Sequence, residues 1–443
     1  MANKPAQLAR PGVFDAHHPP AQEIIDKCVH CGFCLPVCPT YVLWHEEMDS
    51  PRGRIYLMKM ARQATAPMSR EWVGHFDACL GCVACMSACP SGVDYGKLIE
   101  ATRAQIERNY KRSLGEKLHR SLLFETLPRP DRLDLLRWPL LAYQKSGLQE
   151  WLRATGLLSL LPRFLSGLDA LLPKLAPLEP LPACIPAKGQ RLKRVGLLLG
   201  CVQRVFLSPV TAATARVLSA EGYEVVAPPD QPCCGALLIH AGEEARALEL
   251  ARQTIDAFEN AHVDYIISNA AGCGSNLKEY GYLLRDDPAY ADRAKRFAAQ
   301  CRDICEVLTE APPRSERKPI YARAAVHDSC HLQHAQGVRT QPRSLLGQIP
   351  GLELLEIPES AVCCGSAGIY NLVQPDAANE LGDRKASLIT PLQPTVVVTG
   401  NPGCLFQLQA ALQRAKNPVP VLHTLQLLDA SIRGATLESL LTT

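Results

Sequence analysis

The chain has 443 residues, 47% hydrophobic and 21% charged, so it can bury more than one core, and two or three domains are expected. The formal net charge of +3 and the absence of any Lys/Arg-rich run argue against a nucleic-acid partner. Nineteen cysteines are unusual, yet disulfide-dense proteins are mostly small and secreted. Because no apolar signal region opens the sequence, we expect reduced thiols that ligate metals or clusters.

The location expected from the sequence is cytoplasmic, either soluble or peripheral on the inner membrane. No uncharged apolar stretch reaches the roughly 18–20 residues that a transmembrane helix needs. About the first twenty residues, rich in Pro, Ala and His, are expected to be disordered.

Residues 21–115 contain two cysteine runs with the spacing C-x2-C-x2-C-x3-C-P. A 4Fe–4S cubane needs one thiolate on each of four iron corners, and a loop with cysteine at every third residue can reach three of them. Zinc usually draws four ligands to one centre from two separated C-x2-C pairs, so these runs favour two 4Fe–4S clusters over paired zinc sites. The runs are Cys28, Cys31, Cys34 and Cys38, followed by Cys79, Cys82, Cys85 and Cys89.

The fourth cysteine of each run stands before a proline, where the chain starts in a new direction. In two-cluster ferredoxins this cysteine ligates the other cluster. The predicted ligands are therefore Cys28, Cys31, Cys34 and Cys89 for the first cluster, and Cys79, Cys82, Cys85 and Cys38 for the second.

The remainder of this region predicts a mostly helical ferredoxin-like domain, because residues 52–64 and 96–112 have helical spacing. His30, inside the first loop, is expected to be exposed or to donate a hydrogen bond near the cluster, since the thiolate count is complete without it. Basic side chains after the first loop could offset the negative charge of a cluster and tune its potential, or form a solvated helix face. These are Arg52, Arg54 and Lys59.

Residues 116–190 form a linker rich in Leu and Pro, which we expect to be helical. Within it, residues 151–175 are apolar with scattered charges and two prolines, too interrupted to span a bilayer. Three interpretations remain open for this segment: short amphipathic helices on a membrane surface, packing against another subunit, or packing on the protein itself.

An internal repeat follows, predicted as one module at 191–310 and another at 320–435. The first single cysteine lies 32 residues before a Cys-Cys-Gly motif in one copy and 33 in the other. The last single cysteine follows the motif by 39 and 40 residues, and such agreement indicates a duplicated domain. Apolar runs before the single cysteines alternate with helical segments, which predicts two tandem α/β modules with parallel sheets. The overall class is therefore α+β multidomain.

Each module supplies four cysteines that could hold a further iron–sulfur centre or zinc, or act as redox thiols. Glycine after each pair would permit close backbone approach to an inorganic core. The sets are Cys201, Cys233, Cys234 and Cys273, then Cys330, Cys363, Cys364 and Cys404.

The other cysteines and the histidines of this region allow simpler interpretations. Three cysteines outside the repeat are expected to be buried small hydrophobic residues: Cys184, Cys301 and Cys305. Three histidines could ligate a metal or line a quinone pocket, although a lone histidine is more often structural: His240, His331 and His334.

In its order of motifs the sequence resembles the iron–sulfur subunit of bacterial glycolate dehydrogenase (glycolate oxidase), over about residues 22–430. More distantly it is similar to the C subunit of anaerobic glycerol-3-phosphate dehydrogenase, lactate-utilisation proteins and heterodisulfide reductase. The strings that carry the resemblance are CVHCGFCLPVCPTY, SPRGRIYLMK, CPSGV, TAATARVL, CCGA, GCGSNLKEYG, LQHAQ and CCGSAG.

The resemblance implies a complex in which separate FAD-binding subunits oxidise glycolate to glyoxylate, and D-lactate is a further candidate substrate. This chain would pass the electrons toward the quinone pool or another membrane acceptor. It contains no G-x-G-x-x-G fingerprint for FAD or NAD and no obvious base–nucleophile pair, so substrate oxidation is expected on the partner and FAD only there. Alternatives are the same role for lactate or glycerol 3-phosphate, a thiol–disulfide enzyme, or a scaffold with zinc sites.

Relatives similar to heterodisulfide reductase end such a module in Cys-x2-Cys and hold an unusual cluster there. Here the last position is Asn276 in the first copy and Gln407 in the second. The missing fifth cysteine argues against that cluster and against disulfide reduction by this chain.

Overall fold

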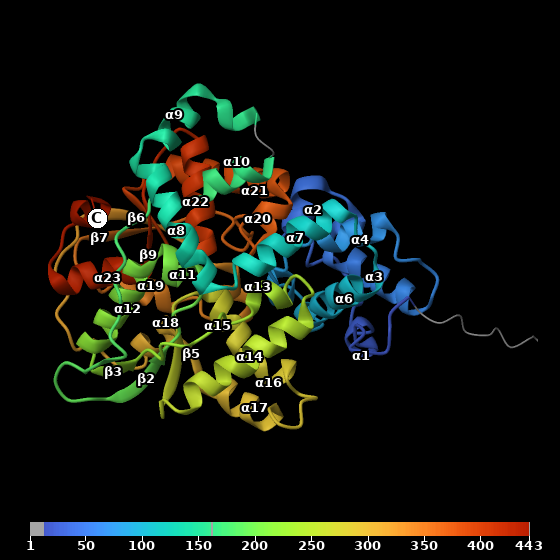
Figure 1. Cartoon of the computed structure of the whole chain (residues 1–443), viewed down its shortest axis with the longest axis horizontal. Helices are drawn as coiled ribbons and strands as arrows, with labels where there is room; N and C mark the ends of the chain where they lie inside the picture. Colours follow the sequence, from blue (N-terminus) through green and yellow to red (C-terminus); the bar gives the residue numbers. More distant parts are fainter. Residues whose placement is uncertain (1–12, 161–162, 443) are drawn as a thin grey trace, which may run out of the picture. The chain divides into compact units, whose positions relative to one another are not determined.

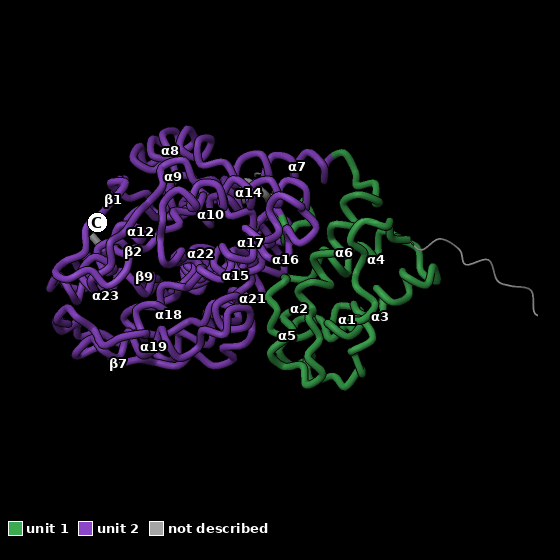
Figure 2. Tube along the Cα trace, turned by 90° about the horizontal axis from the view of Figure 1, so that it is seen from below, with its two compact units in different colours: residues 1–114, 239–243 green, residues 115–238, 244–443 purple. Residues whose placement is uncertain are grey.

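The computed structural model describes residues 13–160 and 163–442. Most of the segment expected to be disordered, residues 1–12, lies outside the described residues. The chain forms two compact units: residues 1–114 with 239–243, and residues 115–238 with 244–443 (Figure 2). None of the described helices combines the length and the apolarity needed to cross a membrane.

The first unit is helical, and its described residues in 13–114 contain no strand. Prolines and polar caps set the helix starts: Pro39 opens α2 directly after Cys38, and the Ser50 hydroxyl accepts a hydrogen bond from the Gly53 amide at the start of α3. This confirms the predicted mostly helical ferredoxin-like fold. Its helices are α1 Gln22–Ile25, α2 Pro39–Trp44, η1 Glu47–Asp49, α3 Pro51–Arg62, α4 Arg70–Asp77, α5 Ala84–Ser87 and α6 Tyr95–Asn109.

The linker is also helical in its described part. Helix α8 packs on α11 of the first module, and α10 packs on α20 and α22 of the second. Part of the linker therefore packs on the protein itself, whereas Trp151 in α9 is 55% exposed. The elements are α7 Leu114–Thr126, α8 Pro130–Lys145, α9 Leu148–Thr155, η2 Leu157–Leu160 and α10 Arg163–Leu171.

The first module has a five-stranded sheet in the order β1-β3-β2-β4-β5. Of these strands, β2, β3 and β5 are labelled in Figure 1. All neighbouring strands pair in parallel except β1, which lies antiparallel to β3 at the edge. Its strands are β1 Cys184–Ile185, β2 Lys193–Leu197, β3 Tyr223–Val226, β4 Tyr265–Ser268 and β5 Cys301–Asp303. Its helices are α11 Val202–Phe206, α12 Ser208–Ala220, α13 Ala236–Ile239, α14 Glu244–Glu259, α15 Ala271–Lys278, α16 Tyr280–Leu283, α17 Ala291–Gln300 and α18 Ile304–Thr309.

The second module repeats this topology with a four-stranded parallel sheet in the order β7-β6-β8-β9. The two sheets thus match strand for strand apart from β1, as a duplicated α/β module requires. Its strands are β6 Ala322–His327, β7 Leu352–Glu356, β8 Val396–Thr399 and β9 Val421–His423. Its helices are η3 His331–Ala335, α19 Gln341–Leu346, α20 Tyr370–Val373, α21 Pro375–Ile389, η4 Thr390–Leu392, α22 Pro402–Arg414, α23 Thr424–Arg433 and α24 Leu437–Thr442.

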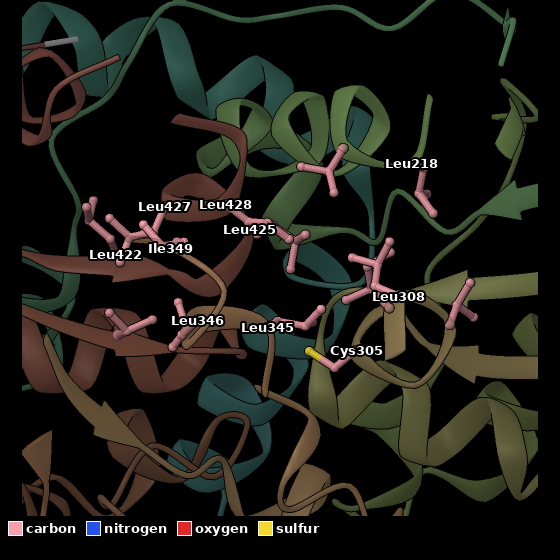
Figure 3. Close-up of a cluster of buried hydrophobic side chains, with 14 of the residues drawn as sticks. Leu218, Cys305, Leu308, Leu345, Leu346, Ile349, Leu422, Leu425, Leu427 and Leu428 are labelled. Atoms are coloured by element: carbon pink, nitrogen blue, oxygen red, sulfur yellow. The ribbon is translucent and has the colours of Figure 1, made fainter. Parts of the chain in front are cut away.

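One hydrophobic core extends through both modules. It joins Leu218 of α12 and Leu308 of α18 to Leu346 of α19 and Leu427 of α23, all of which belong to the same buried cluster (Figure 3). Polar contacts add to it at the carboxyl ends of the strands, where the Ala271 amide donates to the Gly400 carbonyl at 3.2 Å. The two modules therefore fold around a shared interior.

The expectation for the three cysteines outside the repeat is correct for two of them. Cys301 and Cys305 are buried, at 1% and 3% exposure. Cys184 is exposed, so its predicted burial is wrong. The reason is its place in β1, a two-residue edge strand whose outer side has no neighbour.

Candidate metal centres

The first unit gathers its eight cysteines around two adjoining cavities. One cavity is lined by Cys28, Cys31, Cys34 and Cys89, together with Cys85. Of these, Cys31 is exposed and Cys28, Cys34 and Cys89 are half-buried. Val29 and Phe33 beside them are 68% and 66% exposed. This cavity opens at an apolar surface.

The second cavity is lined by Cys38, Cys79, Cys82 and Cys85. All four are buried. Because Cys85 lines both cavities, the two lie next to each other. Each cavity thus brings together one of the crosswise sets, with the fourth cysteine coming from the other run.

The backbone turns in the same way in both loops. The second and fourth residues after the first cysteine have left-handed φ: His30 and Gly32 in one loop, Gly81 and Val83 in the other. A β-branched residue such as Val83 rarely adopts φ of 53°, and such strain is kept chiefly at functional sites. The turn directs the Gly81 amide at the Cys79 sulfur, 3.4 Å away.

Two arginines of α3 serve different cavities. Arg52 lines the first cavity, donates to the His30 carbonyl at 3.1 Å and pairs with Glu47 at 2.6 Å. Arg54 lines the second cavity and is fully buried, donating to the Thr40 hydroxyl at 3.1 Å and the Asp49 carboxylate at 3.0 Å.

Of the remaining polar residues predicted near the first loop, His30 lines the first cavity. Lys59 lines neither cavity. The His30 side chain is exposed, and exposure is one of the two alternatives predicted for it.

Charge around the second cavity favours thiolate at Cys79. Burial raises the pKa of this thiol, but the positive charges of Arg54 and Arg103, together with hydrogen bonds from the Gly81 amide and the Tyr95 hydroxyl, bring its pKa below the ordinary range. Burial also works against the charge of Arg54, yet negative charge on Cys79, Cys38 and Asp49 raises the pKa of Arg54 above its usual value. Cys34 at the open cavity differs, because burial raises its pKa to about 11.

The first module brings its four cysteines into a chain of contacts. The Cys233 thiol lies 3.4 Å from the sulfur of Cys201, and Cys234 contacts Cys233 and Cys273. The side chain of Asn276, where a fifth cysteine is missing, donates to the Cys234 carbonyl at 2.7 Å. The amide therefore fixes the backbone of the pair.

The second module gathers its cysteines likewise and adds a histidine that the sequence analysis missed. Cys363 contacts Cys330 and Cys364, and Cys364 contacts Cys404. His327, the last residue of β6, belongs to this buried group. The signal that could have found it is its place three residues before Cys330, at the end of a predicted strand.

The glycine of each Cys-Cys-Gly motif has a structural task. Gly235 and Gly365 have φ of +83° and +93°. A Cβ at Gly365 would meet the Ala378 carbonyl oxygen at 2.5 Å, and one at Gly235 would meet the Ala247 oxygen at 3.2 Å. At both glycines the Cβ position faces the backbone of a following helix, so this close helix contact requires glycine.

Two of the three histidines noted in the sequence have side chains in polar contacts, His240 and His334. His240 Nδ1 lies 2.9 Å from Glu100 Oε1, and the His240 carbonyl accepts from Arg103 at 2.7 Å. His334 Nε2 lies 3.3 Å from the Ala361 carbonyl. His331 is half-buried in η3. No metal group of three close ligands among the described residues includes any of them.

Comparison with known proteins matches three family models. The model described as 4Fe–4S dicluster domain matches residues 24–93, and that of the glycolate oxidase iron–sulfur subunit linker region matches 115–172. The cysteine-rich domain model matches twice, at 195–278 and 324–409. The double match agrees with the duplicated topology.

Similar full-length proteins come from several bacteria. The probable glycolate oxidase iron–sulfur subunit of Bacillus subtilis is 40% identical over 395 residues, 88% of this chain and 89% of the relative. The glycolate oxidase iron–sulfur subunit of Escherichia coli is 36% identical over 88% of this chain and 91% of the relative. Lactate utilization protein A of Exiguobacterium is 26% identical over 55% of this chain and 100% of its own length.

Proposed function

The chain belongs to the family of glycolate oxidase iron–sulfur subunits, and from this premise we propose that it carries electrons in a complex that oxidises glycolate to glyoxylate. The observation that carries the proposal is the pair of adjoining cavities, each of which contains the four cysteines of one predicted crosswise set, with Cys85 lining both. A flavoprotein partner would supply the electrons, and the quinone pool or another membrane acceptor would receive them.

Each cavity has the donors that a 4Fe–4S cluster needs. Four thiols per cavity fit its four iron corners, and an amide directed at Cys79 sulfur suits a thiolate ligand. Clusters held there would supply one-electron oxidation and reduction. The ligands are Cys28, Cys31, Cys34 and Cys89 in the open cavity, and Cys38, Cys79, Cys82 and Cys85 in the buried one.

The two cavities differ in exposure and in the charge beside them. Buried thiols and the fully buried Arg54 keep water from the second cavity and place positive charge beside it. The first cavity is the accessible one, since Cys31, Val29 and Phe33 are exposed around it. A redox partner can approach the chain there, because electron transfer between proteins requires a short separation of the two centres.

Substrate oxidation belongs to a partner subunit in this proposal. The sequence contains no G-x-G-x-x-G fingerprint for FAD or NAD. FAD would be held by the partner, where glycolate loses its electrons, and D-lactate would be a second substrate of the same site. The complex is then an acceptor-linked dehydrogenase whose substrate site lies on another chain.

The linker offers a surface for assembly. Leu118 of α7, Trp138 of α8 and Trp151 of α9 are 74%, 72% and 55% exposed. Large exposed apolar side chains of this kind mark contacts with a protein or with a membrane surface. We infer that this surface docks the chain to a partner subunit or to the inner membrane. Replacing Trp138 and Trp151 with Glu should release the complex from membranes or from its partner in sedimentation assays, and unchanged association would refute the inference.

Electron carriage can be separated from substrate oxidation by experiment. The chain is co-expressed with its flavoprotein partners, and Cys82→Ser is compared with Cys184→Ser, which changes an exposed cysteine outside both cavities. In the Cys82→Ser complex, glycolate should still reduce the flavin in a single turnover, while steady-state reduction of a quinone analogue should fall at least tenfold. Cys184→Ser should leave both unchanged.

Two outcomes would count against the proposed function. Loss of flavin reduction in Cys82→Ser would place this chain in substrate oxidation, and unchanged quinone reduction would remove it from the electron path. Parallel assays with D-lactate and glycerol 3-phosphate identify the substrate. EPR spectra of Cys38→Ser and Cys89→Ser test the crosswise ligation, since each change should alter the cluster of the other cysteine run.

A further inference from the structure

A compact group of three ligand atoms lies in the second module, outside the ferredoxin-like domain. One ring nitrogen of His327 and the sulfurs of Cys364 and Cys404 all lie within 4.8 Å of one another, and all three residues are buried. Buried thiols and imidazoles gathered in this way are the ligands that zinc and similar divalent metals prefer.

The fold holds these three side chains in place from separate elements. His327 ends β6 and is paired in register with Thr399 of the neighbouring parallel strand β8. Cys404 lies in the first turn of α22, directly after β8, and Cys364 belongs to the loop after β7. The ligands thus meet at the carboxyl edge of the sheet, where α/β folds bind their ligands.

The spacing favours one ion over a cluster. A tetrahedral ion with metal–sulfur bonds of about 2.3 Å and one metal–nitrogen bond of about 2.0 Å holds its ligand atoms about 3.5–3.8 Å apart. A cubane instead binds each thiolate at a separate iron corner, which spreads the ligands farther. Mutual separations within 4.8 Å need only a small adjustment to close on a single ion.

We propose that the second module binds one divalent metal ion of the zinc class through His327, Cys364 and Cys404. Cys363, which contacts Cys364, would take the fourth position. The proposal concerns a site apart from the two cysteine cavities of the first unit and does not depend on the substrate of the complex.

A buried cation beside the group supports an anionic metal site. A divalent ion with three thiolates and one imidazole carries a net charge of −1. Lys385 of α21 is only 2% exposed and donates to the Glu359 carbonyl. Burial lowers the pKa of Lys385, and negative charge at Cys364 and Cys363 works against this by favouring its charged form. A buried positive charge at this place compensates a buried negative one.

The first module has neither the histidine nor the buried lysine of the second. The residue three positions before its first cysteine is Leu198, which is buried and offers no ligand atom. The two Cys-Cys-Gly glycines contact Ala247 and Ala378 in corresponding helices, and this equivalence aligns Lys385 with Thr254. Among the described residues, no comparable group of three ligands includes a cysteine of the first module. The proposed site therefore distinguishes the two copies of the repeat.

The test uses the full chain, purified anaerobically from zinc-supplemented cells. Zinc, iron and acid-labile sulfide are measured per chain, and zinc K-edge X-ray absorption reports the ligands. We expect about one zinc per chain with a mixed sulfur and nitrogen shell. His327→Leu, which installs the residue of the first module, should lower zinc affinity at least tenfold and leave iron unchanged.

Controls separate this site from the rest of the chain. Cys404→Ser should also lose zinc, whereas Cys201→Ser in the first module should retain it, and circular dichroism checks that each variant is folded. If His327→Leu fails to fold, the zinc K-edge spectrum of the wild type still tests the proposal, because it shows directly whether nitrogen is a ligand of the zinc. A zinc-free wild type, a shell of sulfur alone, retention of zinc in a folded His327→Leu variant, or matched loss of iron and sulfide in Cys404→Ser would overturn the proposal.

Discussion

Arg54 shows how one buried side chain can determine the electrostatics of a cavity. It is fully buried at the second cavity and is held by Thr40, Asp49 and the His75 carbonyl. Arg52, two residues away on the same helix, is partly exposed and its charge is balanced by Glu47. Both arginines pair with a carboxylate, but solvent screens Arg52 as well, so Arg54 has the larger effect on its neighbours.

Replacing Arg54 with Gln should lower the midpoint potential of the cluster in the second cavity. Removal of a buried positive charge disfavours the more negative, reduced state, and a shift on the order of 60 mV corresponds to a tenfold change in a one-electron equilibrium. EPR-monitored redox titration measures it. Arg54→Lys, which keeps the charge, should shift the potential less, and equal shifts in both variants would contradict the electrostatic explanation.

Gly365 is required by two features at once, its φ of +93° and the Ala378 carbonyl 2.5 Å from a Cβ position. Gly365→Ala should therefore lower the free energy of unfolding by about 3 kcal/mol. Gly337 has φ of +71° but no atom within 4 Å of its Cβ position, so Gly337→Ala should cost about 1 kcal/mol from strain alone. Equal melting temperatures for the two variants would show that the backbone of α21 at Ala378 moves to make room for the added Cβ.

At the scale of elements, the cap of α18 combines stability with a pH response. Asp303 accepts a hydrogen bond from the Cys305 amide at 2.8 Å, and the Asp303 amide donates to Glu306 at 2.7 Å. This reciprocal capping box begins the helix. Asp303 is buried, and burial raises its pKa from 3.8 to about 6, so the cap holds its proton more tightly in the folded chain than in the unfolded one.

The sign of the pH effect follows from that difference. Between about pH 4 and 6 the Asp303 carboxyl is protonated in the folded chain but ionised in the unfolded one. The stabilisation that this proton gives the folded state is complete below about pH 4 and is lost as the pH rises through about 6. The loss amounts to about 3 kcal/mol. Asp303→Asn keeps the hydrogen-bond acceptor without the charge, so its melting temperature relative to wild type should rise between pH 5 and 7.5. A difference that is constant with pH would exclude Asp303 as its source.

At the scale of the whole molecule, the two copies of the repeat share one interior. Helix α12 of the first module packs on α23 of the second (Figure 1). Arg216 of α12 pairs with Asp429 of α23 at 2.8 Å, where Asp429 is almost fully buried. Neither copy therefore completes its hydrophobic core alone.

Leu218→Ala should destabilise both modules, although the change lies in the first. A fully buried leucine contributes about 2–5 kcal/mol when truncated to alanine, and Leu218 belongs to the cluster that includes β6 and α23. Hydrogen exchange should show loss of protection in peptides from both sheets. Leu122→Ala, at an exposed position, serves as the control, and a loss confined to the first module would show that the copies unfold independently.

Much of this arrangement could be predicted from local sequence. Cysteine spacing determined the chemistry of the first unit, because cluster loops need ligands at fixed short intervals. Repeat spacing and the strand–helix alternation determined the duplicated α/β modules, since these patterns are local. The burial of Cys184 was mispredicted because exposure depends on which strand lies at a sheet edge, a long-range property.

Only the tertiary structure decided which groups outside the motifs meet. The cysteine before each proline already predicted that Cys38 and Cys89 exchange cavities, whereas His327 reaches Cys364 and Cys404 because β6 and β8 end side by side. Sequence by itself determined that the chain has thiol ligands and a duplicated fold. Tertiary packing decided their neighbours, charges and exposure, because these depend on residues far apart along the chain.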